Sequence, residues 1–156
     1  GGGSTEFSVI SNGDRICEKS FRIGTVRLLN NMVKDNIWNE IKNWIVTKTS
    51  NIDNLSLIGT GGNINKIHKI TSTNDFDPIS YSSMRNLSGS MEKLTYNERI
   101  VKYNLNPDRA DVIIPALNIY LKALKWSGSK KIYVPKTGLS DGMIQELFMK
   151  NLKFKS

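Results

Sequence analysis

Glycines and small hydroxyl residues gather in two short stretches of this chain. The first is Gly1-Gly2-Gly3-Ser4-Thr5, followed at once by Glu6, and the second is Gly59-Thr60-Gly61-Gly62. Glycine-rich turns after strands expose main-chain N–H groups, and the lack of side chains lets a phosphate approach them closely. A carboxylate beside such a loop can bind a divalent cation or orient an attacking water molecule. The pattern therefore indicates phosphoryl chemistry.

Each of these candidates has a purely structural alternative. Residues 1–4 have the composition of a flexible linker, most glycine-rich turns bind nothing, and Glu6 can be a solvated strand residue. Arg27 and Arg109 are candidate anion contacts, but Arg109 stands between two aspartates near the start of a predicted helix and can form an ion pair there. Two such turns in one basic chain strengthen the phosphate hypothesis.

Composition narrows the class of protein and its partners. The 156 residues are 38% hydrophobic, enough for one compact domain, and 22 Lys and Arg against 14 Asp and Glu give a formal charge of +8. That charge favours a polyanionic partner without choosing among polyphosphate, nucleic acid and an acidic membrane surface. Cys17 and His68 are the only residues of their types, so neither an internal disulfide nor a zinc cluster is expected, and a cytoplasmic location fits. No apolar run approaches the roughly 18 residues of a membrane-spanning helix.

The first half of the chain reads as a hairpin followed by helix, strand and helix. Residues 5–10 alternate polar and apolar side chains, Asn12-Gly13 is a two-residue turn signal, and residues 14–23 continue in extended character. Residues 25–47 change to a helical period and predict one long or broken helix. A short apolar strand at 55–58 then leads into the second glycine stretch and a further helix.

Helix signals dominate the second half. A helix is predicted over 82–94, interrupted by Gly89, and the capping-box pattern Thr95-Tyr96-Asn97-Glu98 starts another that ends near Asn104. Pro107 occupies the first position of a wide apolar helix. Pro115 is expected to lie inside that helix and bend it, because a mid-helix proline removes a hydrogen bond.

The chain then returns to extended structure. Residues 131–135 predict a strand, and Ser140 starts a last amphipathic helix. Trp38, Trp44 and Trp126 lie beside Ile and Leu at helical spacing, so they are expected in core packing. Strands that alternate with helices after an opening hairpin predict an α/β fold whose sheet is mixed.

Five stretches of the chain carry a resemblance to a known family. They are Gly1 to Glu6, Ser20 to Leu28, Gly59 to Gly62, Pro107 to Ile113, and Gly138 to Gly142. In order and spacing they resemble the exopolyphosphatase/guanosine pentaphosphate phosphatase (Ppx/GppA) family across nearly the whole chain. Because Thr5-Glu6 continues the family's second phosphate loop, the resemblance favours a native loop over a linker.

The resemblance implies a fold and a set of roles. The family belongs to the actin, sugar kinase and acetate kinase superfamily, whose members have two ribonuclease H-like domains with the active site between them; residues 1–156 would be the second, C-terminal domain. The loop matching Gly1 to Thr5 would hold phosphate oxygens. The residue matching Glu6 would bind Mg²⁺ or position the attacking water, which makes it the catalytic and metal-binding candidate. Gly61 and Gly62 stay phosphate candidates on their motif alone.

Part of the family's active site would lie upstream of Gly1, including a central strand, the first phosphate loop and a glutamate of the first domain. We therefore expect this chain to be a domain truncated at its N-terminal strand, inactive without the missing first domain. An exposed sheet edge of that kind would fray or pair with a second copy to form a homodimer.

Two functions of the parent protein remain open from the sequence. The leading hypothesis is a phosphoanhydride hydrolase that releases terminal phosphate from polyphosphate or guanosine pentaphosphate. The alternative is a binding module that holds polyphosphate or a nucleotide without turning it over. Nucleic acid is a distant third partner, because the chain has no motif of RNA or DNA recognition. A membrane is not expected as a partner, since no apolar run is long enough to span one.

Overall fold

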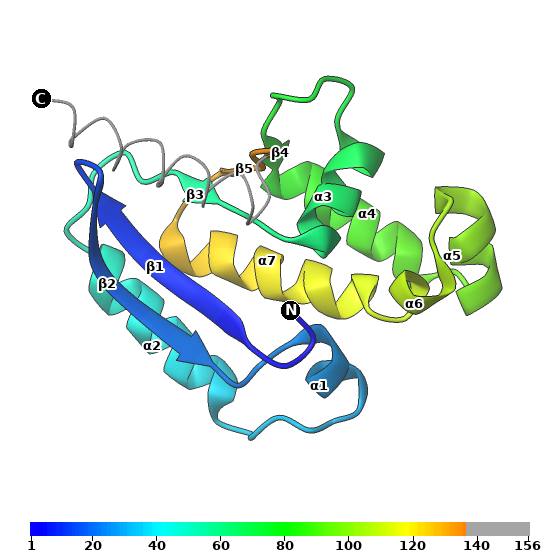
Figure 1. Ribbon diagram of the computed structural model, residues 1–156, viewed down its shortest axis with the longest axis horizontal. Helices are drawn as coiled ribbons and strands as arrows, with labels where there is room; N and C mark the ends of the chain where they lie inside the picture. The colour runs from blue at the N-terminus through cyan, green and yellow to red at the C-terminus, as the bar shows by residue number, and fades with distance from the viewer. Residues whose placement is uncertain (137–156) are drawn as a thin grey trace, which may run out of the picture.

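Two strands open the structure, and helices then alternate with short strands (Figure 1). The computed structural model of this chain describes residues 1–136. In chain order the elements are β1 Thr5–Ser11, β2 Asp14–Phe21, α1 Thr25–Leu29, α2 Ile37–Thr49, β3 Leu57–Ile58, α3 Gly62–Thr71, β4 Ile79–Ser80, α4 Tyr81–Glu92, α5 Tyr96–Tyr103, α6 Pro107–Ala110, α7 Ile113–Ser127 and β5 Lys131–Tyr133. This arrangement confirms the predicted α/β class.

The opening hairpin forms where the sequence predicts it. β1 and β2 pair antiparallel, and the turn residues Asn12 and Gly13 both have positive φ, of 52° and 87°. Two-residue hairpin turns favour this conformation because its twist matches that of the strands. The register shifts between Val9 and Ile10, which leaves Ile16 without a partner as the extra residue of a β-bulge.

A second sheet is built from three very short strands in the order β3-β5-β4. β3 is parallel to β5 and β4 is antiparallel to it, so this sheet is mixed, as predicted. β4 has only two residues, too few for any periodicity, and the sequence did not indicate it. Within residues 1–136 the hairpin and this sheet are two separate sheets.

Helix boundaries refine several predictions. The predicted helix over 25–47 is broken into α1 and α2, and α4 continues through Gly89 without interruption. The capping box at the start of α5 is formed in full: the Thr95 hydroxyl accepts from the main-chain N–H of Glu98, and the Glu98 carboxylate accepts from that of Thr95. The residue after α5, Asn104, adopts a left-handed conformation with φ of 47° and ends the helix.

The expectation that Pro115 bends a long helix is wrong. The segment predicted as one helix consists of the four-residue α6 and the separate α7, and α7 starts at Ile113. Pro115 is therefore the third residue of α7. Main-chain N–H groups in the first turn of a helix have no intrahelical partner, so a proline there removes no hydrogen bond.

Helix α7 is the centre of the structure. The hairpin, α1 and α2 lie on one side of it, and the second sheet, α3 and α4 on the other (Figure 1). The larger core cluster contains Ile64, Met84, Met91, Ile113, Leu117, Leu124 and Ile132. The smaller one packs Phe21, Ile23, Ile41, Ile45 and Ala123 with the three tryptophans, which confirms their predicted packing role.

The predicted helix that starts at Ser140, and the family stretch Gly138 to Gly142, lie outside the described residues. Among the helices of residues 1–136, none combines the length and the apolar character needed to cross a membrane.

Candidate functional site

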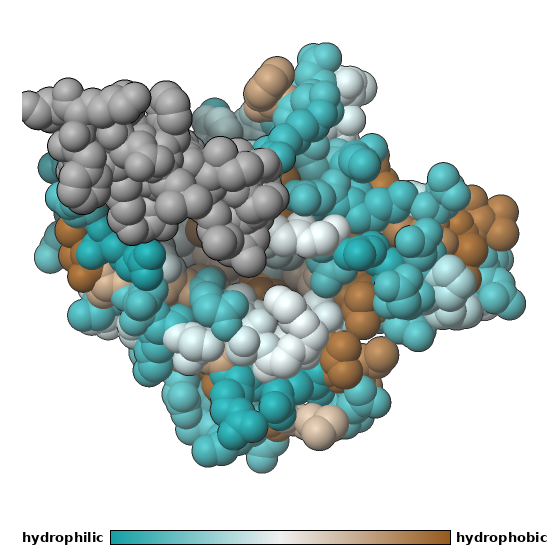
Figure 2. All heavy atoms as spheres, viewed as in Figure 1, coloured by the Kyte–Doolittle hydropathy of each residue, from teal (hydrophilic) through white to brown (hydrophobic). Residues whose placement is uncertain are grey.

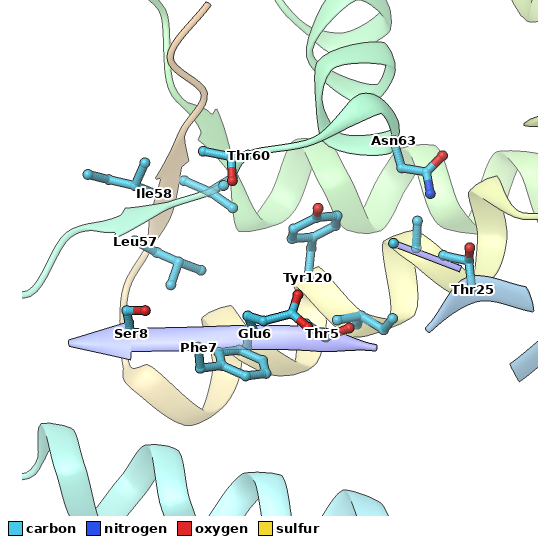
Figure 3. A pocket seen from close by; sticks show the side chains of 16 residues that line it. Thr5, Glu6, Phe7, Ser8, Thr25, Leu57, Ile58, Thr60, Asn63 and Tyr120 are labelled. Atoms are coloured by element: carbon cyan, nitrogen blue, oxygen red, sulfur yellow. The ribbon is translucent and has the colours of Figure 1, made fainter. Parts of the chain in front are cut away.

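One pocket of about 220 Å³ brings residues from distant parts of the sequence together (Figure 3). One side is formed by the start of the chain and β1, the other by β3 and the turn after it, and α7 lies behind. Its lining residues are Gly1, Thr5, Glu6, Phe7, Ser8, Thr25, Leu57, Ile58, Gly59, Thr60, Asn63, Ala116, Ile119, Tyr120, Ala123 and Ile132. Both glycine-rich stretches thus contribute to the same pocket.

Among the described residues that line the pocket, Glu6 is the only one with a charged side chain. Its Oε1 accepts hydrogen bonds from the hydroxyl of Ser4, at 2.5 Å, and from that of Ser20, at 3.0 Å. The Ser4 bond is the larger cause and the Ser20 bond a smaller one of a pKa below the ordinary value of 4.5, although partial desolvation opposes them. Glu6 is therefore an oriented carboxylate anion at neutral pH.

The loop before β1 turns its carbonyl groups toward α1. The Gly1 carbonyl accepts from the N–H of Thr25 at 3.2 Å, and that of Gly2 accepts from the N–H groups of Val26 and Arg27 at 3.1 and 3.3 Å. The N–H groups of residues 2–4 donate to no acceptor among the described residues. The Gly1 and Gly2 carbonyl groups are bonded to α1, and the main-chain N–H groups of residues 2–4 have no acceptor in this part of the chain. Free N–H groups of this kind can bind an anion.

Two further contacts hold this loop. A Cβ placed on Gly24 would lie 2.4 Å from the main chain of Gly2, so only glycine at position 24 permits the packing. The guanidinium of Arg27 donates through Nε to the Gly3 carbonyl at 2.9 Å. Arg27, which was predicted as an anion contact, therefore holds the loop in place. Its two terminal guanidinium nitrogens take no part in the bond to Gly3.

Thr5 has a structural role that the sequence did not indicate. Its hydroxyl donates to the Ile23 carbonyl at 2.6 Å, so its proton is not available to a phosphate oxygen. Of the predicted loop residues, Gly1, Thr5 and Glu6 line the pocket, whereas Gly2, Gly3 and Ser4 lie beside it.

The second glycine stretch joins β3 to α3 in a tight turn. A Cβ on Gly59 would lie 2.6 Å from Ile132, and Gly61 has a φ of 116°, which L side chains rarely adopt. No side chain caps the N-terminus of α3. Gly61 and Gly62 themselves do not line the pocket, but their neighbours Thr60 and Asn63 do.

The Arg109 side chain lies against the start of α3. Its Nη1 donates to the Asn63 side-chain oxygen at 2.8 Å, and a Cβ on Gly62 would be only 3.0 Å from that nitrogen. No salt bridge of Arg109 with Asp108 or Asp111 is formed among the described residues, so the ion-pair alternative is wrong. Arg109 is held by Asn63 at the edge of the pocket.

Sequence reasoning did not single out five polar residues of this site: Ser8, Thr25, Asn63 and Tyr120, which line the pocket, and Ser20, which donates to Glu6. None of them carries a local sequence signal, and Ser20 faces Glu6 only through the register shift at the β-bulge. Burial raises the pKa of Tyr120 to about 12, so its hydroxyl stays protonated at physiological pH. Figure 3 shows the Tyr120 ring between Glu6 and Thr60.

The basic side chains of residues 1–136 lie outside the pocket, because no Lys or Arg of this part of the chain lines it. Figure 2 shows residues of intermediate hydropathy where the chain starts, between the hairpin and α7. Within residues 1–136 no three His, Cys, Asp or Glu side chains cluster around a possible metal position. In this part of the chain Glu6 supplies the one carboxylate that lines the pocket.

Several solved structures have the same fold. This chain spans about half the length of each of them. An exopolyphosphatase from Cytophaga hutchinsonii matches with a TM-score of 0.75 at 19% identity, over 94% of this chain and 54% of that one. The Aquifex aeolicus Ppx/GppA family member matches with a TM-score of 0.72 at 19% identity, over 97% of this chain and 55% of that one. Comparison with curated proteins gave no match.

Family membership follows from the sequence profile of the Ppx/GppA phosphatase family, which matches residues 1–151. The match includes the loop with Glu6, the Gly59–Gly62 turn and all of the pocket. It agrees with the resemblance carried by the five stretches and with the fold of the solved structures. The chain belongs to the Ppx/GppA phosphatase family.

Proposed function

We propose that this chain is the second, C-terminal domain of a two-domain phosphoanhydride hydrolase and provides one wall of its active site. The observation that carries the proposal is the pocket in which an oriented Glu6 carboxylate, beside the Gly1–Ser4 loop, faces the Gly59–Gly62 turn. The family match and the length of the solved relatives, about twice that of this chain, support it.

The loop suits the terminal phosphoryl group of a substrate. Its free N–H groups at residues 2–4 would bind the phosphoryl oxygens, and Arg27 holds the loop in that shape through the Gly3 carbonyl. Such preorganised donors stabilise charge that develops during phosphoryl transfer. On the other side, Arg109 and the uncapped start of α3 would bind a neighbouring phosphate of a chain such as polyphosphate.

Glu6 suits the binding of a cation or the orientation of water better than the removal of a proton. Its lowered pKa makes it a weak base at neutral pH. Mg²⁺ is commonly held by one or two carboxylates, with water and substrate phosphates as its other ligands, so the single carboxylate fits this cation. When bound, Mg²⁺ would neutralise phosphate charge.

The substrate class of the parent protein is proposed as polyphosphate or guanosine pentaphosphate. One observation favours the binding-module alternative for this chain in isolation. Among the described residues, Glu6 is the only carboxylate that lines the pocket. A transition state needs charge stabilisation from both walls of a cleft. We therefore expect this chain to bind the anion and to release no phosphate without a partner domain.

Calorimetric titration with tripolyphosphate, with and without Mg²⁺, tests the proposal. The matched variants are Glu6→Gln and Glu18→Gln, since Glu18 is an exposed strand residue outside the pocket. We expect Mg²⁺ to strengthen binding to the unmodified chain and to Glu18→Gln at least about fivefold, and to have no effect on Glu6→Gln. Equal Mg²⁺ dependence of the two variants would show that Glu6 is not the cation ligand.

A further inference from the structure

A groove of about 380 Å³ lies between α1, α4 and α7, and we call it the α1–α4–α7 groove. Both α1 and α4 pack on α7 (Figure 1) and form the two walls of the groove. Its lining residues are Leu28 of α1, Ser88 and Glu92 of α4, and Ile114, Pro115, Asn118 and Leu121 of α7. None of these residues lines the pocket that contains Glu6, so the groove is a separate cavity.

Helix α7 separates the two cavities. On the groove side the spacing i, i+4, i+7 places Ile114, Asn118 and Leu121 on one face of the helix. The α7 residues on the pocket side, among them Ala116 and Ala123, stand about half a turn away from that face. A ligand in the groove would therefore leave the Glu6 pocket open.

Four side chains give the groove an apolar surface: Leu28, Ile114, Pro115 and Leu121. Each of them is only partly buried, so each exposes apolar atoms to water. Release of this water favours the binding of an apolar group in its place. A cavity of about 150 Å³ holds a benzene molecule, so the groove has room for an alkyl chain or an aromatic ring.

Glu92 is the only charged side chain of residues 1–136 that lines the groove. The hydroxyl of Ser88, a residue that is only 7% exposed, donates to Oε1 of Glu92 at 3.0 Å and orients the carboxylate. Glu92 itself is exposed, so this carboxylate lies at the rim of the groove. Within residues 1–136 Glu92 forms no salt bridge, and its Oε2 accepts no hydrogen bond. The negative charge is therefore available to a bound cation.

The position of Glu92 along the groove follows from the packing of α4 on α7. The Arg99 side chain donates to the Met91 carbonyl at 3.0 Å and to the Ala110 carbonyl at 3.5 Å. These bonds bring the end of α4 to the residues just before α7. Glu92 follows Met91, so its carboxylate lies at the end of the groove where α7 begins. Leu121, about two turns along α7, lies at the opposite end.

The apolar surface and the single negative charge select among ligands. An anion such as phosphate would meet only a carboxylate, because no Lys or Arg of residues 1–136 lines the groove. A metal ion would pair with Glu92 but would leave the apolar side chains uncovered. An uncharged apolar molecule would cover those side chains but leave Glu92 without a partner. An organic cation with an apolar body matches both features.

We propose that the α1–α4–α7 groove binds a small organic cation. Its protonated amine pairs with Glu92, and its apolar body extends along α7 from Ile114 toward Leu121, against Leu28 of α1. Because the amine stays partly hydrated at the rim, the ion pair adds a modest preference to the burial of the apolar body. The proposal does not depend on the phosphatase activity.

NMR titration of the full, isotopically labelled chain tests the proposal with three probes that share one alkyl chain: hexylammonium, hexan-1-ol and hexanoate. At neutral pH they are positive, uncharged and negative. We expect hexylammonium to bind about twofold to fivefold more tightly than hexan-1-ol, the range of an exposed ion pair, and hexanoate to bind more weakly than either. Amide signals should shift at residues 28, 88–92 and 114–121.

Matched glutamate variants locate the charge. Glu92→Gln keeps the size of the side chain and should abolish the preference for hexylammonium over hexan-1-ol. Glu6→Gln removes the carboxylate of the other pocket and should leave this preference as it is, which excludes binding beside Glu6. Leu121→Ala should weaken the binding of all three probes, with circular dichroism checking that the variants fold.

Several results would overturn the proposal. They are equal affinity of the unmodified chain for hexylammonium and hexan-1-ol, a preference that survives Glu92→Gln, and no binding of any probe. Signal shifts confined to residues outside the groove would do the same.

Discussion

Ser20 donates a 3.0 Å hydrogen bond to Glu6 and stands directly opposite it across the hairpin. The bulge at Ile16 produces this pairing. Continuing the register of the turn, in which Ser11 faces Asp14, would place Lys19 opposite Glu6; the extra residue shifts the partner to Ser20. A hydroxyl instead of an ammonium group beside Glu6 leaves its negative charge unneutralised and able to attract a cation.

The hydrogen bonds to Glu6 give a prediction about its pKa. Replacing Ser4 or Ser20 by Ala should raise the pKa of Glu6 toward its ordinary value, with the larger rise for Ser4→Ala because the Ser4 bond is the main cause of the shift. Carbon-13 NMR titration of the Glu6 carboxyl group measures this. Ser8→Ala, on the same strand and without a bond to Glu6, is the control and should change nothing.

Stability at acid pH follows from the same shift. Because the pKa of Glu6 is lower in the folded state, its ionised form favours folding above the ordinary value of 4.5, and this contribution is lost as the pH falls through the folded-state pKa. The free energy of unfolding should therefore decline more steeply below about pH 4.5 in the unmodified chain than in Glu6→Gln. Urea unfolding across this range tests it; parallel curves would contradict it.

Packing of the loop on Gly24 predicts opposite effects for two glycine substitutions. Gly24→Ala should destabilise the chain by about 1–3 kcal/mol and speed amide exchange at Thr25 and Val26, because the new methyl group overlaps the Gly2 main chain. Gly89→Ala, within α4 and with open space around it, should stabilise the chain by about 0.5–1 kcal/mol. Thermal unfolding compares the two.

Arg27 is predicted to act through the loop. Arg27→Ala removes the bond to the Gly3 carbonyl, so exchange of the amides at residues 25–27 should become faster and tripolyphosphate binding weaker by about threefold to tenfold. Arg22→Ala removes the same charge at an exposed residue outside the pocket. If Arg27→Ala and Arg22→Ala weaken tripolyphosphate binding equally, Arg27 acts only through its charge.

The capping box predicts a local loss of stability. Thr95→Ala should destabilise the chain by about 0.5–2 kcal/mol, because the side chain that accepts from the Glu98 N–H is removed. Thr73→Ala, at an exposed loop residue without a side-chain hydrogen bond among the described residues, should have little effect. Chemical denaturation of both variants measures the change in the free energy of unfolding.

Some of this structure could be predicted from the sequence because the signals are local. Asn12-Gly13 between alternating residues identifies the hairpin, and Thr95 with Glu98 identifies the start of α5, since these residues form the turn or cap through their own conformations and hydrogen bonds. The Gly1–Thr5 loop and Glu6 were predicted as site residues from their motif and from the family resemblance, and these roles remain predictions. Each depends on residues close together in the chain.

Other features were decided only by contacts between distant residues. The bulge that brings Ser20 to Glu6, the packing of Gly2 on Gly24 and the Arg109 contact with Asn63 leave no local pattern. The start of α7 at Ile113 likewise depends on how α6 and α7 pack. It places Pro115 in the first turn of the helix, where a proline removes no hydrogen bond. A local signal determines a backbone conformation. The partner of a side chain is instead determined by the arrangement that buries the most apolar surface while satisfying the polar groups. That arrangement is a property of the whole fold.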